Sequence, residues 1–506
     1  MNHWIVLPVL IPATVAALAL LGMRRTLRLG RAAALGSCLS LLAISSMLLV
    51  QADNGVVQTY AVGDWAAPFG IVLVLDRLSA LMLVLTSALA TVVLVHVIAT
   101  DLDRRGWHFH PMFQFQLLGL NGAFLTGDLF NLFVFFEVLL IASYGLMLHG
   151  QGAERLKAGV HYVVVNLVGS TLFLVAIGLL YGVTGTLNMA HMAVQVAVLP
   201  AADEGLARAG GLLLLVVFGL KAALLLLHLW LPRTYANTSA PVAALFAIMT
   251  KVGVYALIRM FTLVFGAEAG ALALLGEPWL LPAALLTVVI GFAGLFAART
   301  LRELAAYGVI GSTGTLLTAT SLFAQEPLAA ALYYLPHTTL SGAAMFLLAD
   351  LVGRRRGELR DALLLGPRFR WSEPLAAFYL LTAIAIAGLP PLSGFVGKLL
   401  ILSSTRAAAA APWIWAVILV TTLIAVLGFA RAGSLLFWKS AAVGDARPGG
   451  HNPPSGELLG VAALMLLLAL LSLFALPVTR YMGSTAEQLL APRATIQSIL
   501  DRGGSR

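Results

Sequence analysis

Long apolar runs follow one another along almost the whole chain, separated by short polar segments. A membrane-spanning helix needs about 20 predominantly apolar residues. The pattern therefore predicts an all-α polytopic membrane protein with fourteen transmembrane helices. Their predicted limits are 4–22, 32–50, 70–98, 112–126, 129–148, 158–181, 208–232, 240–265, 278–297, 303–323, 328–350, 373–404, 411–437 and 456–476.

Two of these spans contain residues that interrupt helices. Pro232 ends the seventh span, where we expect a break. The twelfth span contains Gly388, Pro390 and Pro391. Proline removes a backbone donor and clashes with the preceding turn, and the freed polar groups are tolerated in a membrane only when protein or water satisfies them. A broken helix in each half of a chain is typical of ion pathways in inverted-repeat transporters, although the amino-acid sequence shows no obvious repeat.

The composition agrees with a membrane protein. The chain is 60% hydrophobic and only 10% charged, with a mean hydropathy of +0.96, whereas soluble domains have about 25% charged residues. The single cysteine, Cys38, excludes an intrachain disulfide and argues against a metal site. Because no glycine-rich nucleotide loop follows a predicted strand, we expect no cofactor. The first basic cluster follows the first apolar run, so this run is expected to remain as a helix.

The net charge of +9 has a topological explanation. In a soluble protein it would suggest nucleic acid, but here the basic residues gather in the odd-numbered loops, and the even loops have little beyond Arg208 and Arg406. The positive-inside rule then places the odd loops in the cytoplasm and both termini in the periplasm, with no nucleic-acid partner. The basic residues of the odd loops are Arg24, Arg25, Arg28, Arg31, Arg104, Arg105, Arg155, Lys157, Arg233, Arg299, Arg302, Arg354, Arg355, Arg356, Arg360, Arg368, Arg370, Lys439 and Arg447.

Five ionisable residues lie well inside predicted spans, where each costs roughly 2.5–3.5 kcal/mol on insertion. Any one of them has a structural interpretation, since a buried acid can pair with a lysine and a histidine can be a hydrogen-bonded core residue. Five on five different helices, none near a basic-flanked end, favour a transport pathway instead. The five residues are Glu137, Lys221, Lys251, His337 and Lys398.

Hydroxyl and imidazole groups accompany these five residues. His228 follows Lys221 by seven positions, so we expect both on one helix face about 10 Å apart. Such groups, with trapped water, can pass protons between titratable side chains. The supporting polar residues are His228, Tyr255, Tyr333, Thr338, Ser341 and Thr313.

Glu137 and Lys221 are the obvious partners for a switch. Burial disfavours the charged form of a lysine, whereas a nearby carboxylate favours it. The lysine would hold its proton while paired and release it when the acid is neutralised or moves away. The same charges would also suit the gating of a small cation, and the residues do not separate these roles.

Three features outside the spans receive structural interpretations. Asp76 and Arg77, at the outer start of the third span, are interpreted as an interfacial ion pair. The basic loop at 353–370 is interpreted as a cytoplasmic topology anchor. The tail is predicted to form a short surface helix around 484–499.

Several stretches resemble the antiporter-like membrane subunits shared by respiratory complex I and the multisubunit Mrp (or Pha) cation/proton antiporters. They are "GDLFNLFVFFEVLLIASYGLMLHG", "YGVTGTLNMA", "HLWLP", "APVAALFAIMTKVGVYALIR", "ALYYLPHTTLSGAAMFLLADL" and "GLPPLSGFVGKLLIL". The resemblance covers about residues 5–475. Within the family, the first stretch, the segment 69–87 and the chain length most resemble the D-type subunits of Mrp antiporters.

The resemblance implies two inverted five-helix repeats, centred on broken helices seven and twelve. The corresponding division is 1–110 for helices one to three, 111–265 and 278–437 for the two repeats, and 438–506 for helix fourteen and the tail. The five buried ionisable residues match the family's charged residues on helices five, seven, eight, eleven and twelve. The family commonly has a proline shortly before the histidine of "HLWLP", and its absence here predicts a less sharply broken seventh helix.

The resemblance therefore implies a transporter subunit, with no enzymatic chemistry of its own, that translocates protons in a multisubunit Na⁺ or K⁺/H⁺ antiporter of a bacterial inner membrane. The implied partners are the A, B, C, E, F and G-type subunits, protons, Na⁺ or K⁺ and the lipid bilayer. Two alternatives stay open. One is a proton-pumping, non-redox subunit of an NADH:quinone oxidoreductase or membrane-bound hydrogenase. The other is a stand-alone secondary transporter.

Overall fold

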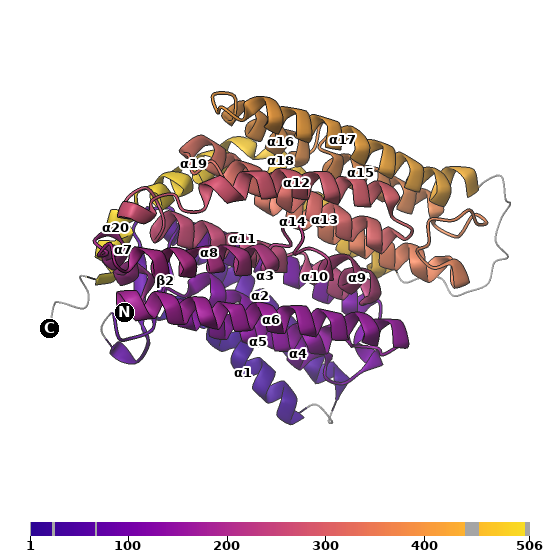
Figure 1. The fold of residues 1–506 in the computed structure, drawn as a ribbon. Coiled ribbons are helices and arrows are strands. Elements are labelled where there is room, and N and C mark those ends of the chain that lie inside the picture. Colours follow the sequence, from indigo (N-terminus) through magenta and orange to yellow (C-terminus); the bar gives the residue numbers. More distant parts are fainter. Residues whose placement is uncertain (1, 23–25, 66–67, 441–454, 501–506) are drawn as a thin grey trace.

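The computed structural model describes residues 2–22, 26–65, 68–440 and 455–500. Within these ranges, nine helices are long and apolar enough to cross a membrane. Most helices run side by side along one direction (Figure 1). The predicted all-α membrane architecture is confirmed, whereas the number of fourteen spans remains a prediction. Arg24, Arg25 and Arg447, which contributed to the predicted orientation, lie outside the described residues.

The N-terminal part of the chain contains a β-hairpin that the sequence analysis did not predict. Strand β1 (Gln58–Ala61) pairs antiparallel with β2 (Val72–Leu75). The predicted span 70–98 is therefore wrong at its start. The Asp76 carboxylate accepts a hydrogen bond of 2.8 Å from the backbone N–H of Ser79, which caps the following helix and separates it from β2. The helices of this part are α1 (Leu7–Gly22), α2 (Leu27–Ala52) and α3 (Arg77–Ala99).

The remaining helices form two successive groups and a C-terminal segment. The first group contains α4 (Phe109–Leu125), α5 (Leu129–Met147), α6 (Ala153–Thr184), α7 (Met189–Ala197), α8 (Glu204–Lys221), α9 (Trp230–Asn237), α10 (Ala240–Phe246) and α11 (Met249–Leu263). The second group contains α12 (Glu277–Ala297), α13 (Leu301–Thr320), α14 (Gln325–Arg355), α15 (Ser372–Ala387), α16 (Ser393–Ser404) and α17 (Ala411–Gly433). The last three helices are α18 (Leu459–Leu473), α19 (Ala475–Leu490) and α20 (Pro492–Leu500).

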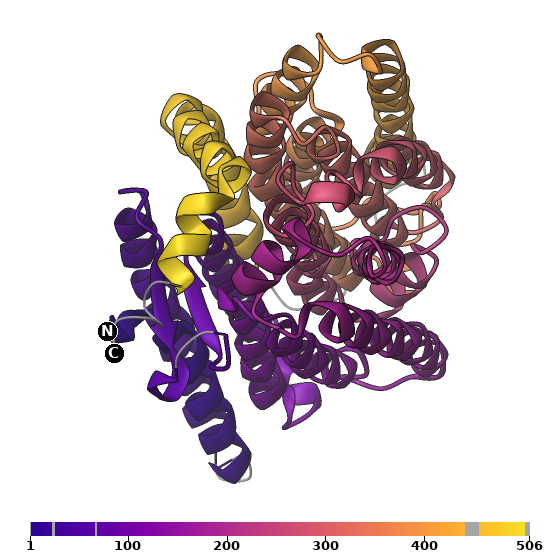
Figure 2. The same ribbon diagram turned by 60° about the vertical axis from the view of Figure 1, so that its left-hand side comes forward.

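The C-terminal helices pack against the N-terminal part of the chain. Figure 2 shows them, in yellow, beside the indigo N-terminal helices. Helix α18 packs on α3, α19 on α14, and α20 on α7 and β1. The predicted surface helix at 484–499 is thus divided between α19 and α20, and α19 begins almost directly after α18. This arrangement follows from the apolar face of α19, whose Met482, Ala486 and Leu489 are buried.

The helices end at two opposite faces. We call the end that carries β1, β2, α7 and α20 the hairpin face (Figure 1). The other end, the basic face, contains the connections 100–108, 148–152, 298–300 and 356–371. Several of its arginines hold these connections together, since Arg302 pairs with Asp361 at 2.8 Å and donates to the carbonyl oxygen of Thr238 at 3.1 Å. Arg302 therefore joins connections of both helix groups at this face.

A second charge cluster of the basic face surrounds Asp103. Its carboxylate is buried and accepts from Arg31 Nη2 at 2.6 Å, and it lies 3.0 Å from His110 Nε2. Burial by itself raises the pKa of Asp103, but the hydrogen bonds with His110 and Arg31 outweigh it and lower the pKa to about 2. The carboxylate thus remains charged in the folded protein at any physiological pH.

Replacing Asp103 by asparagine is expected to lower the free energy of unfolding by about 2 kcal/mol at neutral pH. Because the folded pKa lies below the usual 3.8, the stabilisation is complete above pH 3.8 and is lost as the pH falls through about 2. Thermal unfolding of the purified wild type and variant across this acidic range measures the difference. A difference that does not narrow with falling pH would contradict the assignment.

Candidate functional site

The first broken span is interrupted before Pro232. Helix α8 ends at Lys221 and α9 begins at Trp230, and between them Ala223 and Leu226 have φ values of 58° and 66°. This left-handed conformation is unusual for residues other than glycine and ends the helix. Pro232 itself lies in the first turn of α9, where a missing N–H does no harm. The prediction that Pro232 breaks this span is therefore wrong, because the helix already ends at Lys221. The less sharp break relative to the family stays a prediction.

Polar backbone groups at this break are hydrogen-bonded to side chains of other elements. The carbonyl oxygen of Leu220 accepts from the Trp230 indole N–H at 3.1 Å. The N–H of Leu225 donates to Thr287 Oγ1, on α12, at 2.8 Å. Polar backbone groups freed inside a membrane require such partners. A proline was not needed, because tertiary contacts stabilise the broken conformation.

Lys221 lies at the end of α8, next to the break, and is buried. Its ammonium donates to Asn166 Oδ1, on α6, at 3.1 Å. Glu137, on α5, is half-buried and accepts a hydrogen bond from the Ser170 hydroxyl. Asn166 and Ser170 are one turn apart on α6, so this helix connects the acid with the lysine. The expected direct ion pair between Glu137 and Lys221 is absent from the described part of the chain, and the two residues instead contact Ser170 and Asn166.

His228 does not share a helix face with Lys221. It lies inside the break, at the residues that separate α8 from α9, and is buried. The predicted helical spacing of the two residues is therefore wrong, because the helix ends at Lys221.

Lys251 is fully buried on α11, and its polar contacts are with two threonines. Its ammonium donates to Thr250 Oγ1 at 3.2 Å and to Thr313 Oγ1, on α13, at 3.4 Å. Two residues on, Gly253 allows α11 to approach the end of α8 closely, since an added Cβ would lie 2.8 Å from the carbonyl carbon of Lys221. The two lysine-bearing helices are thus in direct backbone contact, while Thr313 links Lys251 to the second group of helices.

The second broken span brings His337 and Lys398 together. Helix α15 ends at Ala387 and α16 begins at Ser393. His337 Nδ1, on α14, is hydrogen-bonded to Ser393 Oγ at 2.9 Å. The Lys398 ammonium donates to the carbonyl oxygen of Ala387 and to Thr422 Oγ1, both at 2.8 Å. The free carbonyl end of a helix carries partial negative charge, so it suits an ammonium group.

Glycines make this second break compact. Gly388 lies in the break together with Pro390 and Pro391, and its φ of 74° is left-handed. A Cβ added at Gly394 would lie 2.8 Å from His337 Nε2 and 2.0 Å from the carbonyl oxygen of Ala385. Only a glycine therefore lets α16 begin this close to His337.

The structure joins some of the predicted residues and leaves others apart. His337 and Lys398 both contact residues that border the second break, Ser393 and Ala387. No hydrogen bond between described residues joins Lys221 to Lys251. The Tyr333 hydroxyl donates to the carbonyl oxygen of Leu471 on α18, at 3.0 Å. Thr338 and Ser341 are buried near His337 on α14.

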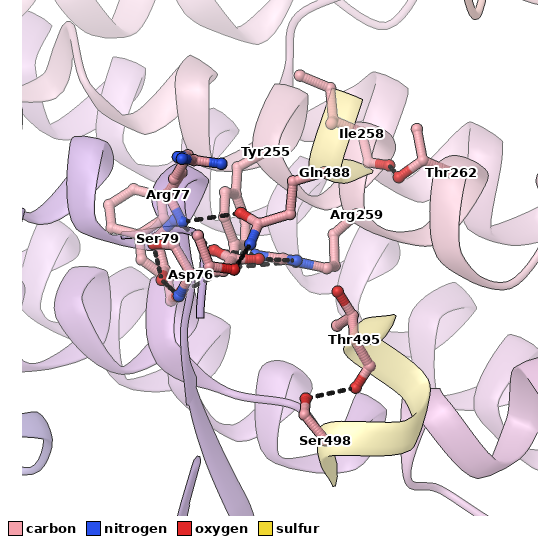
Figure 3. Close-up of polar contacts among 12 residues, drawn as sticks. Asp76, Arg77, Ser79, Tyr255, Ile258, Arg259, Thr262, Gln488, Thr495 and Ser498 are labelled. Carbon is pink, nitrogen blue, oxygen red and sulfur yellow. Dashed lines mark hydrogen bonds and ion pairs between the residues drawn. The ribbon is translucent and has the colours of Figure 1, made fainter. Parts of the chain in front are cut away.

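Asp76 pairs with Arg259 rather than with Arg77 (Figure 3). Asp76 Oδ1 accepts from Arg259 Nη2 at 3.0 Å, and the same nitrogen donates to the Tyr255 hydroxyl at 3.0 Å. Tyr255 is therefore engaged by Arg259, and no hydrogen bond joins it to Lys251 in the described structure. Arg77 instead donates to the carbonyl oxygen of Asp53 at 2.6 Å. The predicted Asp76–Arg77 pair is wrong, because the helix cap turns Asp76 inward.

Sequence reasoning missed the hydrogen-bond partners of the charged residues. The polar spacing of Asn166 and Ser170, one helical turn apart in a long apolar helix, was an available signal. No comparable signal exists for Ser393, Thr422 or the Asp76–Arg259 pair, since their partners are distant in the chain.

A family model for the transmembrane part of NADH:quinone oxidoreductases and Mrp antiporters matches residues 126–425. The D-type subunit of a probable K⁺/H⁺ antiporter from Rhizobium meliloti is 41% identical, over 100% of this chain and 99% of the relative. The D-type subunit of an Na⁺/H⁺ antiporter from Alkalihalophilus pseudofirmus is 36% identical, over 99% and 100%. A chain of the Mrp complex from a Dietzia species has a TM-score of 0.85 at 27% identity, over 99% of this chain and 100% of that one. This chain therefore belongs to the NADH:quinone oxidoreductase/Mrp antiporter family of transmembrane proteins, among its D-type antiporter subunits.

Proposed function

We propose that this chain is the proton-translocating subunit of a multisubunit antiporter that exchanges Na⁺ or K⁺ for H⁺. The observation that carries the proposal is the set of five buried or half-buried ionisable residues at the two broken helices and their neighbours. They lie in a membrane-embedded helical core, where ionisable groups are costly and usually functional. The names of the antiporter relatives support the same function.

In this proposal protons move between three groups of residues. Glu137 and Lys221 form the first group, connected by α6. Lys251 and Thr313 form the second, and His337, Ser393 and Lys398 the third. When Glu137 is charged, its field favours the protonated form of Lys221, and when it is neutralised the proton is released toward Lys251. Water has to enter the space between Lys221 and Lys251 for this transfer.

The proposal includes an orientation and two repeats. The arginines of the basic face favour a cytoplasmic location for it, so the hairpin face and both termini would be periplasmic. We assign the repeats to 111–265 and 278–437, each with one broken helix. The two breaks, next to Lys221 and Lys398, support this assignment because each has a buried lysine beside it.

Partner subunits of the A, B, C, E, F and G types are also part of the proposal. Glu137 is only half-buried, although it lies near the middle of α5. Its helix also exposes the apolar side chains of Val134 and Ile141. A carboxylate at this depth is poorly suited to lipid. We therefore assign the α5 surface around Glu137 to contact with another subunit.

The function is tested by expressing the complete complex in a bacterial strain that lacks its own antiporters. Everted membrane vesicles are energised, and the collapse of the pH gradient is measured after addition of Na⁺, K⁺ or Li⁺. Exchange with at least one cation is expected. The family also contains oxidoreductase subunits, so NADH- or hydrogen-driven proton pumping without cation exchange would support that alternative instead.

The Lys398→Ala variant is expected to lose most of the exchange rate, because Lys398 is the last titratable group of the proposed pathway. The vesicle assay measures the rate, and immunodetection measures the amount of chain in the membrane. The control is Arg406→Ala, which removes a cation just beyond the end of α16. Full exchange in Lys398→Ala would place the end of the pathway elsewhere.

A further inference from the structure

Helix α6 stands between the two charged residues of the first group. Asn166 contacts Lys221, and Ser170, one turn later, contacts Glu137. Asn166 is buried and Ser170 nearly so, which is unusual for polar residues in a helix with so many lipid-facing apolar positions. Each of the two polar side chains therefore has a specific charged partner.

The orientation of the Asn166 amide is determined by its other hydrogen bond. Asn166 Nδ2 donates to the carbonyl oxygen of Tyr162 at 2.9 Å. This contact directs Oδ1 toward the Lys221 ammonium, since the opposite orientation would point N–H groups at a cation. The amide oxygen is thus presented to Lys221 as a fixed acceptor.

Further contacts join α6 to its neighbours close to Asn166 and Lys221. The Tyr162 ring stacks on Trp230 with a centroid distance of 5.3 Å, and its hydroxyl is hydrogen-bonded to Ser143 Oγ at 2.8 Å. Trp230 in turn donates to the carbonyl oxygen of Leu220, the residue before Lys221. Tyr162 and Trp230 therefore join α6 to the broken helix next to the Asn166–Lys221 contact.

We propose that Asn166 is a positioning residue that holds the protonated amine of Lys221 through a neutral acceptor, while Ser170 holds the Glu137 carboxylate. The inference rests on the proposed proton translocation. A neutral amide accepts from an ammonium without adding charge, so it stabilises the protonated lysine less than a carboxylate in direct contact would. Lys221 then remains able to release its proton, and Glu137 influences it through space.

The pH dependence of exchange in everted vesicles tests this role. Asn166→Leu keeps the branched arrangement of heavy atoms but removes the acceptor, so the protonated lysine loses one charge-assisted hydrogen bond. The pH of half-maximal exchange is expected to shift to lower values by about one unit. Asn166→Asp has nearly the same shape and places a carboxylate beside Lys221, so the profile is expected to shift to higher pH. A merely structural residue would change the rate without opposite shifts.

Thr171, the next residue of α6, provides a matched control. It is exposed, and its hydroxyl bonds only the backbone of its own helix at 3.0 Å, so Thr171→Val should leave the profile unchanged. A wild-type pH profile in either Asn166 variant would overturn the inference. If Glu137→Ala is inactive while both Asn166 variants behave as wild type, only this inference fails. If Glu137→Ala exchanges normally, the proposed function fails first.

Discussion

Glu137→Ala and Lys221→Ala are each expected to reduce cation/proton exchange by about a hundredfold or more. Without Glu137 nothing alters the proton affinity of Lys221 during the cycle, and without Lys221 the first group has no base to receive the proton. Both residues line one small region, connected through Ser170 and Asn166. Initial exchange rates in everted vesicles, normalised to the amount of chain in the membrane, measure the effect.

A matched pair on the surface separates function from general charge effects. Glu154 and Lys157 form an exposed pair at 3.2 Å near the start of α6. Exposed pairs contribute little to stability, so Glu154→Ala and Lys157→Ala should exchange normally. Normal exchange in both Glu137→Ala and Lys221→Ala would make the buried pair structural.

Asp76→Ala is expected to produce the largest loss of stability, about 3–5 kcal/mol. The substitution leaves the guanidinium of Arg259, which is 6% exposed, without its counter-charge. It also removes the cap of α3, worth about 1 kcal/mol. The chain in mild detergent should therefore unfold at a clearly lower temperature than the wild type, and less of it should accumulate in the membrane.

Two further variants assign this loss to the unpaired charge. In Asp76→Ala/Arg259→Leu both charges of this buried pair are removed together, so part of the stability should return. Asp53, whose carboxylate lies 3.9 Å from Arg77 and is 62% exposed, is the matched surface control. Asp53→Ala should change the unfolding temperature little. Equal effects of Asp76→Ala and Asp53→Ala would contradict the burial argument.

The apolar pattern alone was sufficient to predict most helices, because lipid requires long apolar segments with satisfied backbones. It failed where a helix cap or a break lies inside a long apolar run. The segment 72–75 reads as the start of a span but forms a strand, since Asp76 caps the next helix. The break after Lys221 could not be located from Pro232, because the contacts that stabilise it come from Trp230 and Thr287.

The identity of the charged residues was readable from the sequence, because their cost in a membrane makes them stand out wherever they occur. Their hydrogen-bond partners could not be predicted from the sequence. Lys221 meets Asn166, Lys251 meets Thr313, and the partners lie 55 and 62 positions away in the chain. Helical spacing relates only neighbours on one helix, so it misplaced His228 relative to Lys221.

The sequence by itself determined that this protein is a helical membrane protein with five ionisable residues at membrane depth. It did so because hydrophobicity and charge are properties of single residues and short segments. Only the tertiary structure decided which side chains and backbone groups these residues contact, on α6 and at the two breaks. Hydrogen bonds depend on distances of about 3 Å between helices, and the packing of distant segments sets those distances.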